Sequence, residues 1–336
     1  MRWIEKVWYG LSPWHIVLLP LGILFRLMAM LRRALYRIGW LRTIRLPVPV
    51  IVVGNISVGG TGKTPLALWL TIFLREQGFH PGIVSRGYGG YADSPMAVGT
   101  DSDPAVVGDE PLLLAKKGGC PVWIGKDRVA AARALLQTQP ECDVLLSDDG
   151  LQHYRLGRDV EIVVVDGERL FGNGLPLPAG PLREGVSRLR SVDAVVVNGG
   201  RLRLDRPLGN EFGMRLEGRV FYNLRNPQQQ IEAGDLQGKK LHAIAGIGNP
   251  QRFFACLRGL GLAFEEHAFP DHCAYQPQDL AYEEAEALLM TEKDAVKCTG
   301  FADERYWALA VETAMPPAFG QMILQKLRSN DGRQTA

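Results

Sequence analysis

VPVIVVGNISVGGTGKTP, at residues 48–65, is the stretch of sequence that decides the fold. Its apolar beginning predicts a buried strand, its glycines predict a loop, and Pro65 suits the first turn of a helix. In this order the backbone N–H groups of the loop can turn inward around phosphates, and the helix N-terminus adds a favourable dipole. The stretch therefore predicts a P-loop that binds ATP or GTP.

The loop is expected to hold the nucleotide through consecutive residues. Lys63 would reach the β- and γ-phosphates, and the hydroxyl of Thr64 would bind Mg²⁺. The general pattern has glycine at position 57, and we expect Gly59 and Gly60 to supply the flexibility that serine lacks there. The predicted nucleotide-binding residues are Ser57, Val58, Gly59, Gly60, Thr61, Gly62, Lys63 and Thr64.

Short apolar runs alternate with helical stretches after residue 45. Several runs are apolar at consecutive positions, which is typical of parallel strands covered on both faces. This pattern predicts a doubly wound α/β domain of the P-loop NTPase type over residues 46–222. The predicted strands are 48–53, 82–85, 122–125, 144–147, 160–165 and 194–197.

A P-loop needs an acidic partner at the end of a neighbouring strand to hold the metal. Asp148 and Asp149 follow one apolar run, and Asp166 follows another. Either site could instead cap a helix. We prefer the pair, because two adjacent carboxylates could serve the metal and its water together.

The α/β pattern starts again beyond about residue 220. A strand is predicted at 241–245, a helix at 250–260, and late strands near Leu288 and at 306–311. We therefore predict a second, smaller α/β lobe over residues 223–336, entered through the polar linker 223–230.

The N-terminal region is apolar and then basic. Residues 14–30 form an apolar run that contains Pro20, Gly22 and Arg26, and a spanning helix needs roughly 20 apolar residues. A basic stretch follows, which suits a helix lying in or anchored at an anionic leaflet. We predict a membrane-associated segment over residues 1–45; the alternative is a buried helix whose arginines face water. The basic residues are Arg32, Arg33, Arg37, Arg42 and Arg45.

The overall composition excludes some partners. A formal net charge of +2 is too small to predict a nucleic-acid surface, which carries a clustered excess of Lys and Arg. The five cysteines are scattered and form no C-x-x-C pair, so we expect a reducing compartment rather than a zinc site or a disulfide framework.

Further motifs occur in both predicted lobes: SRGYGG at 85–90, GDEP at 108–111, DDGLQH at 148–153, PAGPLRE at 178–184 and TEKDAVKC at 291–298. Together with the P-loop, they resemble the tetraacyldisaccharide 4'-kinase family, the lipid A 4'-kinases of Gram-negative bacteria. The blocks follow the order of the family, and the resemblance covers most of the chain. The family also tolerates a small polar residue at the position of Ser57.

The resemblance implies an activity and a place in the cell. The γ-phosphate of ATP would be transferred, with Mg²⁺, to the 4'-hydroxyl of a tetraacyldisaccharide 1-phosphate, giving lipid IVA. The acyl chains of this glycolipid stay in the inner membrane, so the enzyme would work at its cytoplasmic side. The N-terminal segment would then bring the active site to the lipid.

The resemblance also implies an acid–base pair. Asp109 would accept the proton of the acceptor hydroxyl, and His272, in the block FPDH at 269–272, would orient or tune Asp109 across the cleft. Without the resemblance, Asp109 could equally be a helix cap and His272 a structural residue.

Three further residues are implied to act on phosphate or metal. Glu184 would add to the metal shell of Asp148 and Asp149, and Arg183 would neutralise phosphate charge. Arg128 is a candidate for a substrate phosphate, or else part of a solvated helix face. The glycine-rich block 85–90 is expected near the acceptor, and block 291–294 is expected to cap a helix or support the nucleotide side.

A different class of function deserves comparison. A P-loop ATPase that acts as a switch on a membrane would share the GGTGKT core and a membrane-binding segment. Such proteins carry a lysine before the two glycines, where this chain has Val58. Since a switch also leaves the second lobe unexplained, we predict a kinase.

Overall fold

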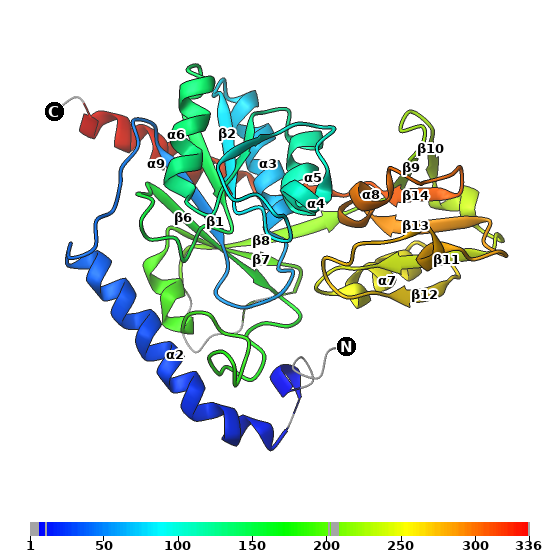
Figure 1. Cartoon of the computed structure of the whole chain (residues 1–336), viewed down its shortest axis with the longest axis horizontal. Coiled ribbons are helices and arrows are strands. Elements are labelled where there is room, and N and C mark those ends of the chain that lie inside the picture. Colours follow the sequence, from blue (N-terminus) through cyan, green and yellow to red (C-terminus); the bar gives the residue numbers. More distant parts are fainter. Residues whose placement is uncertain (1–6, 11, 201, 203–207, 335–336) are drawn as a thin grey trace.

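Two α/β lobes lie side by side in the computed structural model, which describes residues 7–10, 12–200, 202 and 208–334 (Figure 1). A long helix, α2 (Trp14–Arg37), runs along the outside of the larger lobe. This architecture confirms the predicted fold class. The first six residues and residue 11 of the predicted N-terminal segment, and residues 335–336 at the other end, lie outside the described residues.

The larger lobe is built on a nine-stranded sheet with the order β15-β8-β7-β6-β1-β5-β2-β4-β3. The strands from β8 to β4 are parallel, and β15 and β3 are antiparallel at the two edges. The strands are β1 (Val50–Gly54), β2 (Pro81–Ser85), β3 (Met96–Val98), β4 (Val122–Ile124), β5 (Val144–Asp148), β6 (Val160–Asp166), β7 (Ala194–Asn198), β8 (Glu211–Glu217) and β15 (Glu312–Ala314).

Helices cover both faces of this sheet, as the uninterrupted apolar strands require. Leu66 of α3 (Lys63–Glu76) and Leu112 of α5 (Asp109–Gly118) pack on one face, and Val129 of α6 (Arg128–Thr138) packs on the other. All five residues of β1 are buried. Each such apolar side chain contributes about 1.5–3 kcal/mol, so the central strands anchor the lobe. Shorter helices are α4 (Pro104–Val107) and the 3₁₀ helix η1 (Val186–Ser191).

The smaller lobe is built on a six-stranded sheet with the order β10-β9-β14-β13-β11-β12. Strands β14 to β12 are parallel, and β9 and β10 are antiparallel. The strands are β9 (Val220–Asn223), β10 (Gln230–Glu232), β11 (Leu241–Ala245), β12 (Glu265–Ala268), β13 (Ala287–Thr291) and β14 (Tyr306–Leu309). The helices are α7 (Pro250–Gly259), α8 (Glu292–Cys298), and the 3₁₀ helices η2 (Ala233–Leu236) and η3 (Pro277–Leu280).

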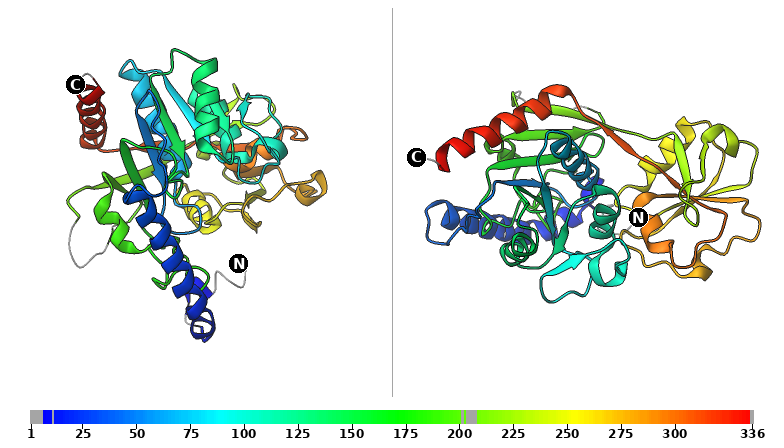
Figure 2. Two further views of the ribbon diagram at one scale, coloured as in Figure 1. Left: turned by 60° about the vertical axis from the view of Figure 1, so that its left-hand side comes forward. Right: turned by 90° about the horizontal axis from the view of Figure 1, so that it is seen from above.

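The chain passes between the lobes twice, from β8 to β9 and again from β14 to β15. The last helix, α9 (Pro317–Gln334), lies over the larger lobe (Figure 2). Its Phe319, Ile323 and Leu327 are buried in the core that also holds Leu66. The sequence assigned all of residues 223–336 to the smaller lobe, and the topology differs because these apolar side chains fill the larger core.

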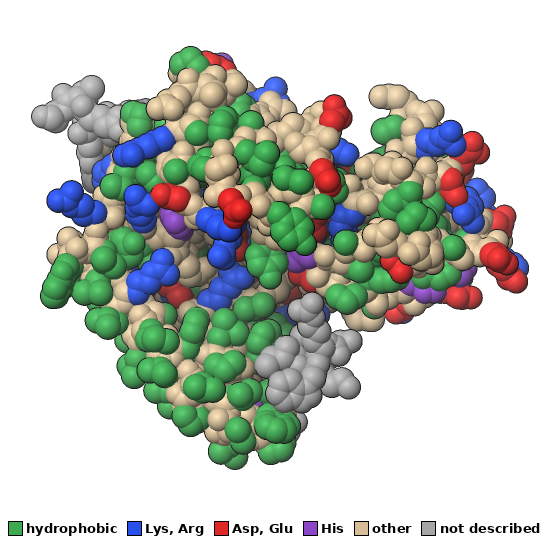
Figure 3. Space-filling view, viewed as in Figure 1, with side chains coloured by type: hydrophobic (Ala, Val, Ile, Leu, Met, Phe, Trp, Pro, Cys, Tyr) green, Lys and Arg blue, Asp and Glu red, His purple; other side chains and the backbone are tan. Residues whose placement is uncertain are grey.

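Helix α2 is exposed along its length. It continues without a break through Pro20, and of its residues, all of which are described, only Gly22 is buried. Apolar side chains gather over it in the space-filling view (Figure 3). The alternative of a buried N-terminal helix is therefore wrong. The apolar residues that are at least half exposed here are Ile16, Val17, Leu21, Ile23, Leu24, Leu27, Met28, Met30 and Leu31.

Candidate active site

The P-loop lies between β1 and α3, as the sequence predicts. Gly59 and Gly62 have φ of +114° and +98°, in the left-handed region that disfavours other residues. A side chain at Gly62 would also collide with the amide of Asn198, whose Nδ2 donates to the Thr61 carbonyl at 3.0 Å. The backbone N–H of Val58 donates to the carbonyl of Pro181 at 2.8 Å. The loop is thus held open by its neighbours in a shape that only glycine permits.

The register between β1 and β5 brings the predicted acidic pair to this loop. Val53 lies opposite Asp148 in parallel pairing, so Asp148 and Asp149 end beside the P-loop. Lys63 Nζ lies 3.6 Å from Asp149 Oδ1, and Arg183 Nη1 donates to both oxygens of Asp149 at 3.3 Å. The structure therefore joins Lys63, Asp149 and Arg183 in one charged group.

The two adjacent carboxyls have opposite electrostatic surroundings. Burial, followed by the negative charge of Glu110, raises the pKa of Asp148 to about 7. Burial also opposes ionisation of Asp149, but the charges of Lys63 and Arg183 outweigh it and lower the pKa of Asp149 to about 2. Asp148 Oδ1 is buried and has no hydrogen-bond partner among the described residues. Asp149 is thus ionised at neutral pH, and Asp148 has one oxygen without a hydrogen-bond donor.

The rival acidic residue, Asp166, has a different environment. Its Oδ1 accepts hydrogen bonds from the backbone N–H groups of Glu168 and Arg169 at 2.9 and 3.1 Å, and from Arg252 Nη2 at 2.6 Å. Asp166 therefore closes a turn and ties the smaller lobe to the larger one. Its contact with Arg252 could not be foreseen from sequence.

The smaller lobe also touches the P-loop itself. The carbonyl of Gly248, in the turn before α7, accepts a hydrogen bond from Arg169 Nη1 at 2.6 Å. A side chain at Gly248 would collide with the backbone N–H of Gly60. The two backbones thus come as close as glycine allows beside the P-loop.

Asp109 of the larger lobe and His272 of the smaller lobe form a second contact between the lobes. Asp109 is the first residue of α5 and is only 5% exposed, and His272 has φ of +60° in the smaller lobe. His272 Nδ1 lies 2.9 Å from Asp109 Oδ1 and 3.1 Å from Oδ2. The ring of Tyr88, from the glycine-rich block, lies 5.0 Å from the His272 ring. The interpretation of Asp109 as a surface helix cap is therefore wrong.

The surroundings of Asp109 and His272 favour the charged form of each residue. Burial would raise the pKa of Asp109, but the hydrogen bond from His272 and the charge of Lys293 lower it overall. Burial would lower the pKa of His272, but the bond to Asp109 raises it. Each partner therefore favours the charged form of the other at the contact between the lobes.

Lys293 is a residue whose place the sequence analysis missed. Its Nζ lies 2.8 Å from Glu110, 3.1 Å from Asp271 and 4.0 Å from Asp109. Thr291 does cap α8, as one interpretation of that block expected, because its hydroxyl accepts the N–H of Asp294. Lys293 and Lys297 share one face of α8 at the i, i+4 spacing, and Lys297 Nζ is also 4.0 Å from Asp109. That spacing was the available signal.

Arg128 and Glu184 take up unequal positions. Arg128 is 3% exposed, so it does not lie on a solvated helix face, and its burial lowers its pKa to about 10 although Asp149 favours the charged form. The carboxylate of Glu184 accepts from Tyr154 Oη at 2.6 Å and from Gln152 Nε2 at 2.8 Å. Its Oε2 also lies 3.4 Å from Arg188 Nε, so Glu184 has its own partners and stands apart from the charged group at the P-loop.

Comparison with known proteins shows which family has this sequence. The chain matches the sequence model of the family described as Tetraacyldisaccharide-1-P 4'-kinase over residues 14–328. The chain belongs to this family. It is 49% identical over 326 residues to a tetraacyldisaccharide 4'-kinase of Methylobacillus flagellatus, covering 97% of this chain and 96% of that one. It is 50% identical over 332 residues to one of Nitrosococcus oceani, covering 97% and 94%.

A solved structure of the tetraacyldisaccharide 4'-kinase family agrees. The "apo" form of LpxK from Aquifex aeolicus in complex with ATP superimposes with a TM-score of 0.79 and 30% identity, covering 93% of this chain and 99% of that one. The predicted kinase activity in lipid A biosynthesis is confirmed by this membership, and a membrane-bound switch ATPase is not supported.

Proposed function

We propose that this tetraacyldisaccharide 4'-kinase performs its transfer in the cleft between the lobes, with ATP and Mg²⁺ on the P-loop and the sugar hydroxyl at Asp109. The observation that carries the proposal is the contact of 2.9 Å between Asp109 and His272, which lie 163 residues apart and come from different lobes. A buried carboxylate held ionised beside a P-loop is suited to accept a hydroxyl proton.

The P-loop fits a nucleotide. Its glycines open the backbone where triphosphate oxygens would lie, and Lys63 is 11% exposed at the end of that loop. Ser57 to Thr64 would hold the phosphates through backbone N–H groups, and the ammonium group of Lys63 would stabilise the negative charge on the γ-phosphate. The turn at Gly248 would close over the phosphates from the smaller lobe.

The donor set also fits Mg²⁺, which prefers hard oxygen ligands. Asp148, Asp149 and the hydroxyl of Thr64 would hold the ion, and the buried Oδ1 of Asp148, which like Oδ2 of Asp166 has no hydrogen-bond partner among the described residues, would gain a ligand. When bound, Mg²⁺ neutralises negative charge on the phosphates. Glu184 would join only after its bonds from Tyr154 and Gln152 were exchanged.

Asp109 has a lowered pKa, which makes it a weak base. Phosphoryl transfer has a loose transition state in most analyses, so the acceptor proton leaves late and a weak, well-placed base suffices. His272 and Lys293 would keep Asp109 ionised and oriented until the proton reaches it. Arg183, tied to Asp149, would neutralise the transferred phosphate, and Arg128 would meet a phosphate of the substrate.

Helix α2 would hold the enzyme at the cytoplasmic face of the inner membrane. With 24 residues it is long and apolar enough to cross a bilayer, and nearly all of its apolar stretch is unburied. Arg33, near its C-terminal end, donates to Ser191 Oγ at 2.9 Å and so fixes the helix to the larger lobe. Exposed apolar side chains followed by arginines suit a lipid surface with anionic headgroups, where the acylated substrate lies.

A transfer assay tests the proposal. Purified protein with ATP, Mg²⁺ and detergent-dispersed tetraacyldisaccharide 1-phosphate should yield the 4'-phosphorylated lipid. Asp109→Asn keeps the shape but not the base, and should lower kcat by roughly 10² to 10⁴ while ATP still binds. Asp103→Asn is the matched control, because Asp103 is an exposed helix cap and asparagine caps equally well. Normal turnover in Asp109→Asn would remove Asp109 from the mechanism, and a loss of ATP affinity would move it to the nucleotide side.

A further inference from the structure

Three metal-ligating side chains meet on the smaller lobe, apart from the cleft. His242 lies on β11, and Glu265 and His267 lie on β12, the edge strand of the sheet. In the parallel register His242 lies opposite Glu265, and Ile244 lies opposite His267. Since residues two apart on a strand share a face, the three side chains project from the same side of the sheet.

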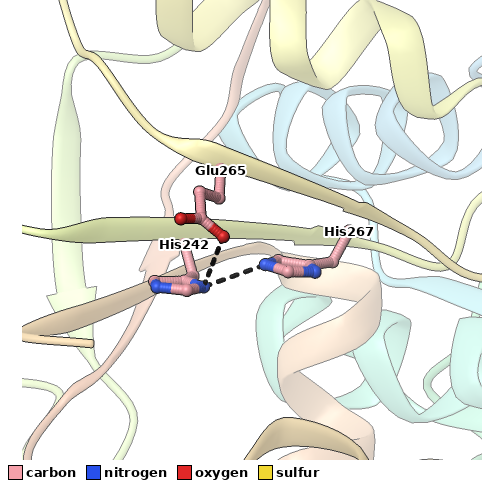
Figure 4. Close-up of side chains that lie close together, drawn as sticks. All are labelled: His242, Glu265 and His267. Atoms are coloured by element: carbon pink, nitrogen blue, oxygen red, sulfur yellow. Dashed lines mark hydrogen bonds and ion pairs between the residues drawn. The ribbon is translucent and has the colours of Figure 1, made fainter. Parts of the chain in front are cut away.

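Their donor atoms converge (Figure 4). His242 Nδ1 lies 2.9 Å from His267 Nε2 and 3.9 Å from Glu265 Oε2. One ligand atom from each residue lies within 4.8 Å of the other two. The side chain of His242 is 11% exposed and that of Glu265 is 74% exposed, so the group is closed toward the sheet and open toward solvent.

The ring of Tyr282 covers the histidines from one side. Its centroid lies 4.7 Å from that of His242 and 4.1 Å from that of His267, with interplanar angles of 24° and 28°. This stacking covers the ring faces, so the nitrogen-bearing edges are left to face each other and Glu265.

Only one proton can lie between the facing ring nitrogens of His242 and His267. In this hydrogen-bonded arrangement one ring donates and the other accepts. If this shared proton moves to the outer nitrogen of the donating ring, the lone pairs of both inner nitrogens become available, with no net change in protonation. A cation can then take the place of the shared proton.

We propose that His242, Glu265 and His267 form a binding site for a divalent transition-metal ion of the Zn²⁺ class. Two imidazoles and one carboxylate are a ligand set that this class prefers, whereas Mg²⁺ favours oxygen ligands. Nitrogens on a tetrahedral ion with bonds of about 2.0–2.1 Å lie slightly further apart than 2.9 Å, so a small rotation of the rings admits the ion. The ion links the edge strand β12 to β11 and keeps one position open to solvent.

Titration of the full chain tests this site. Zn²⁺ binding is measured by calorimetry and Co²⁺ binding by visible absorption, with excess Mg²⁺ present so that the carboxylates near the P-loop are occupied. We expect one ion per chain at this site. His267→Ala should weaken binding by about 10- to 100-fold or more, since even indirect supporting residues have effects of that size. The matched control is His80→Ala, because His80 is an exposed histidine paired only loosely with Asp143 at 3.5 Å.

A second measurement separates loss of the site from loss of the fold. Zn²⁺ should raise the Tm of the natural chain, because a ligand that binds only the folded state stabilises it, and should leave the Tm of Glu265→Gln nearly unchanged. Glu265 is exposed, so this variant keeps the fold. The proposal is overturned if the natural chain and both site variants bind equally, if none binds, or if thiolate bands show cobalt on the cysteines.

Discussion

The P-loop comes from one short stretch between β1 and α3. The pair that we propose acts on the acceptor hydroxyl, here called the acceptor pair, joins Asp109 to His272, 163 residues away in the other lobe. The shape of the loop depends on local backbone angles, such as the φ of +98° at Gly62. The pair depends on how the two lobes dock. Substitutions at the loop should therefore act on phosphate binding and chemistry together, and substitutions at the pair should act on chemistry and on lobe docking.

The largest expected effect concerns the acceptor pair. Asp109→Ala and His272→Ala should each lower kcat by about 10² to 10⁴ with little change in ATP affinity, since neither residue belongs to the P-loop. Residues that act as one unit are not additive, so the double variant should be little worse than the poorer single one. The measurement is a double-mutant cycle in kcat. Fully multiplicative losses would show that the two lobes contribute independently.

The next effect concerns Lys63. Lys63→Ala should lower kcat by roughly 10² to 10³, because the substitution removes a positive charge that would stabilise the negative charge of the transferred phosphate in the transition state. ATP affinity should fall as well, in contrast to the acceptor variants. Steady-state kinetics and a nucleotide-binding assay check both. Lys126→Ala is the control, since Lys126 is exposed and pairs with Asp93; equal effects of the two variants would contradict the assignment.

Substitutions at Asp149 and Asp166, the two acidic strand ends, should affect different properties. Asp149→Asn should shift the Mg²⁺ concentration needed for activity by about 10- to 100-fold, as loss of a metal-site residue does. Asp166→Asn should leave that requirement unchanged and lower the free energy of unfolding by about 1–3 kcal/mol, because Arg252 loses the charge of its nearer partner and keeps only Glu168 at 3.5 Å. Magnesium titrations and denaturant unfolding separate the two outcomes. A shifted Mg²⁺ requirement in Asp166→Asn alone would mean that β6, not β5, carries the metal site.

The smallest effect is on stability against pH. The raised pKa of His272 means that its bond to Asp109 contributes fully below the unfolded value of about 6.5 and is lost as pH rises through the folded value. The lowered pKa of Asp109 means that this contribution is also lost in strong acid, below its ordinary value of 3.8.

The stability difference between the natural chain and His272→Gln should therefore be largest near pH 5 to 6, at about 1–2 kcal/mol, and shrink toward pH 9. Thermal unfolding across this range measures it. The control is His80→Gln, because His80 lies on the surface of the larger lobe, away from the cleft. A difference that grows with pH would show that His272 is neutral in the folded protein.

Much of the larger lobe could be predicted because its signals are local. The six predicted strands correspond to β1, β2, β4, β5, β6 and β7, and several of them are apolar at consecutive positions. The two edge strands β3 and β15 and the neighbouring strand β8 were missed, and β8 is mostly exposed or half-buried and lacks an apolar run. The residues of helix α9 were assigned to the smaller lobe and pack on the larger one, because an apolar helix face does not indicate which sheet it will cover.

The sequence by itself determined the P-loop, its lysine and threonine, and the family, because adjacent residues must adopt particular backbone angles around a phosphate. Only the tertiary structure decided which acidic residue meets Lys63, since that follows from the register of β1 with β5. The same holds for Lys293, which turns toward Asp109, and for Glu184, whose carboxylate is taken by Tyr154. The physical reason is that these contacts join distant parts of the chain, and their geometry arises only when the lobes pack together.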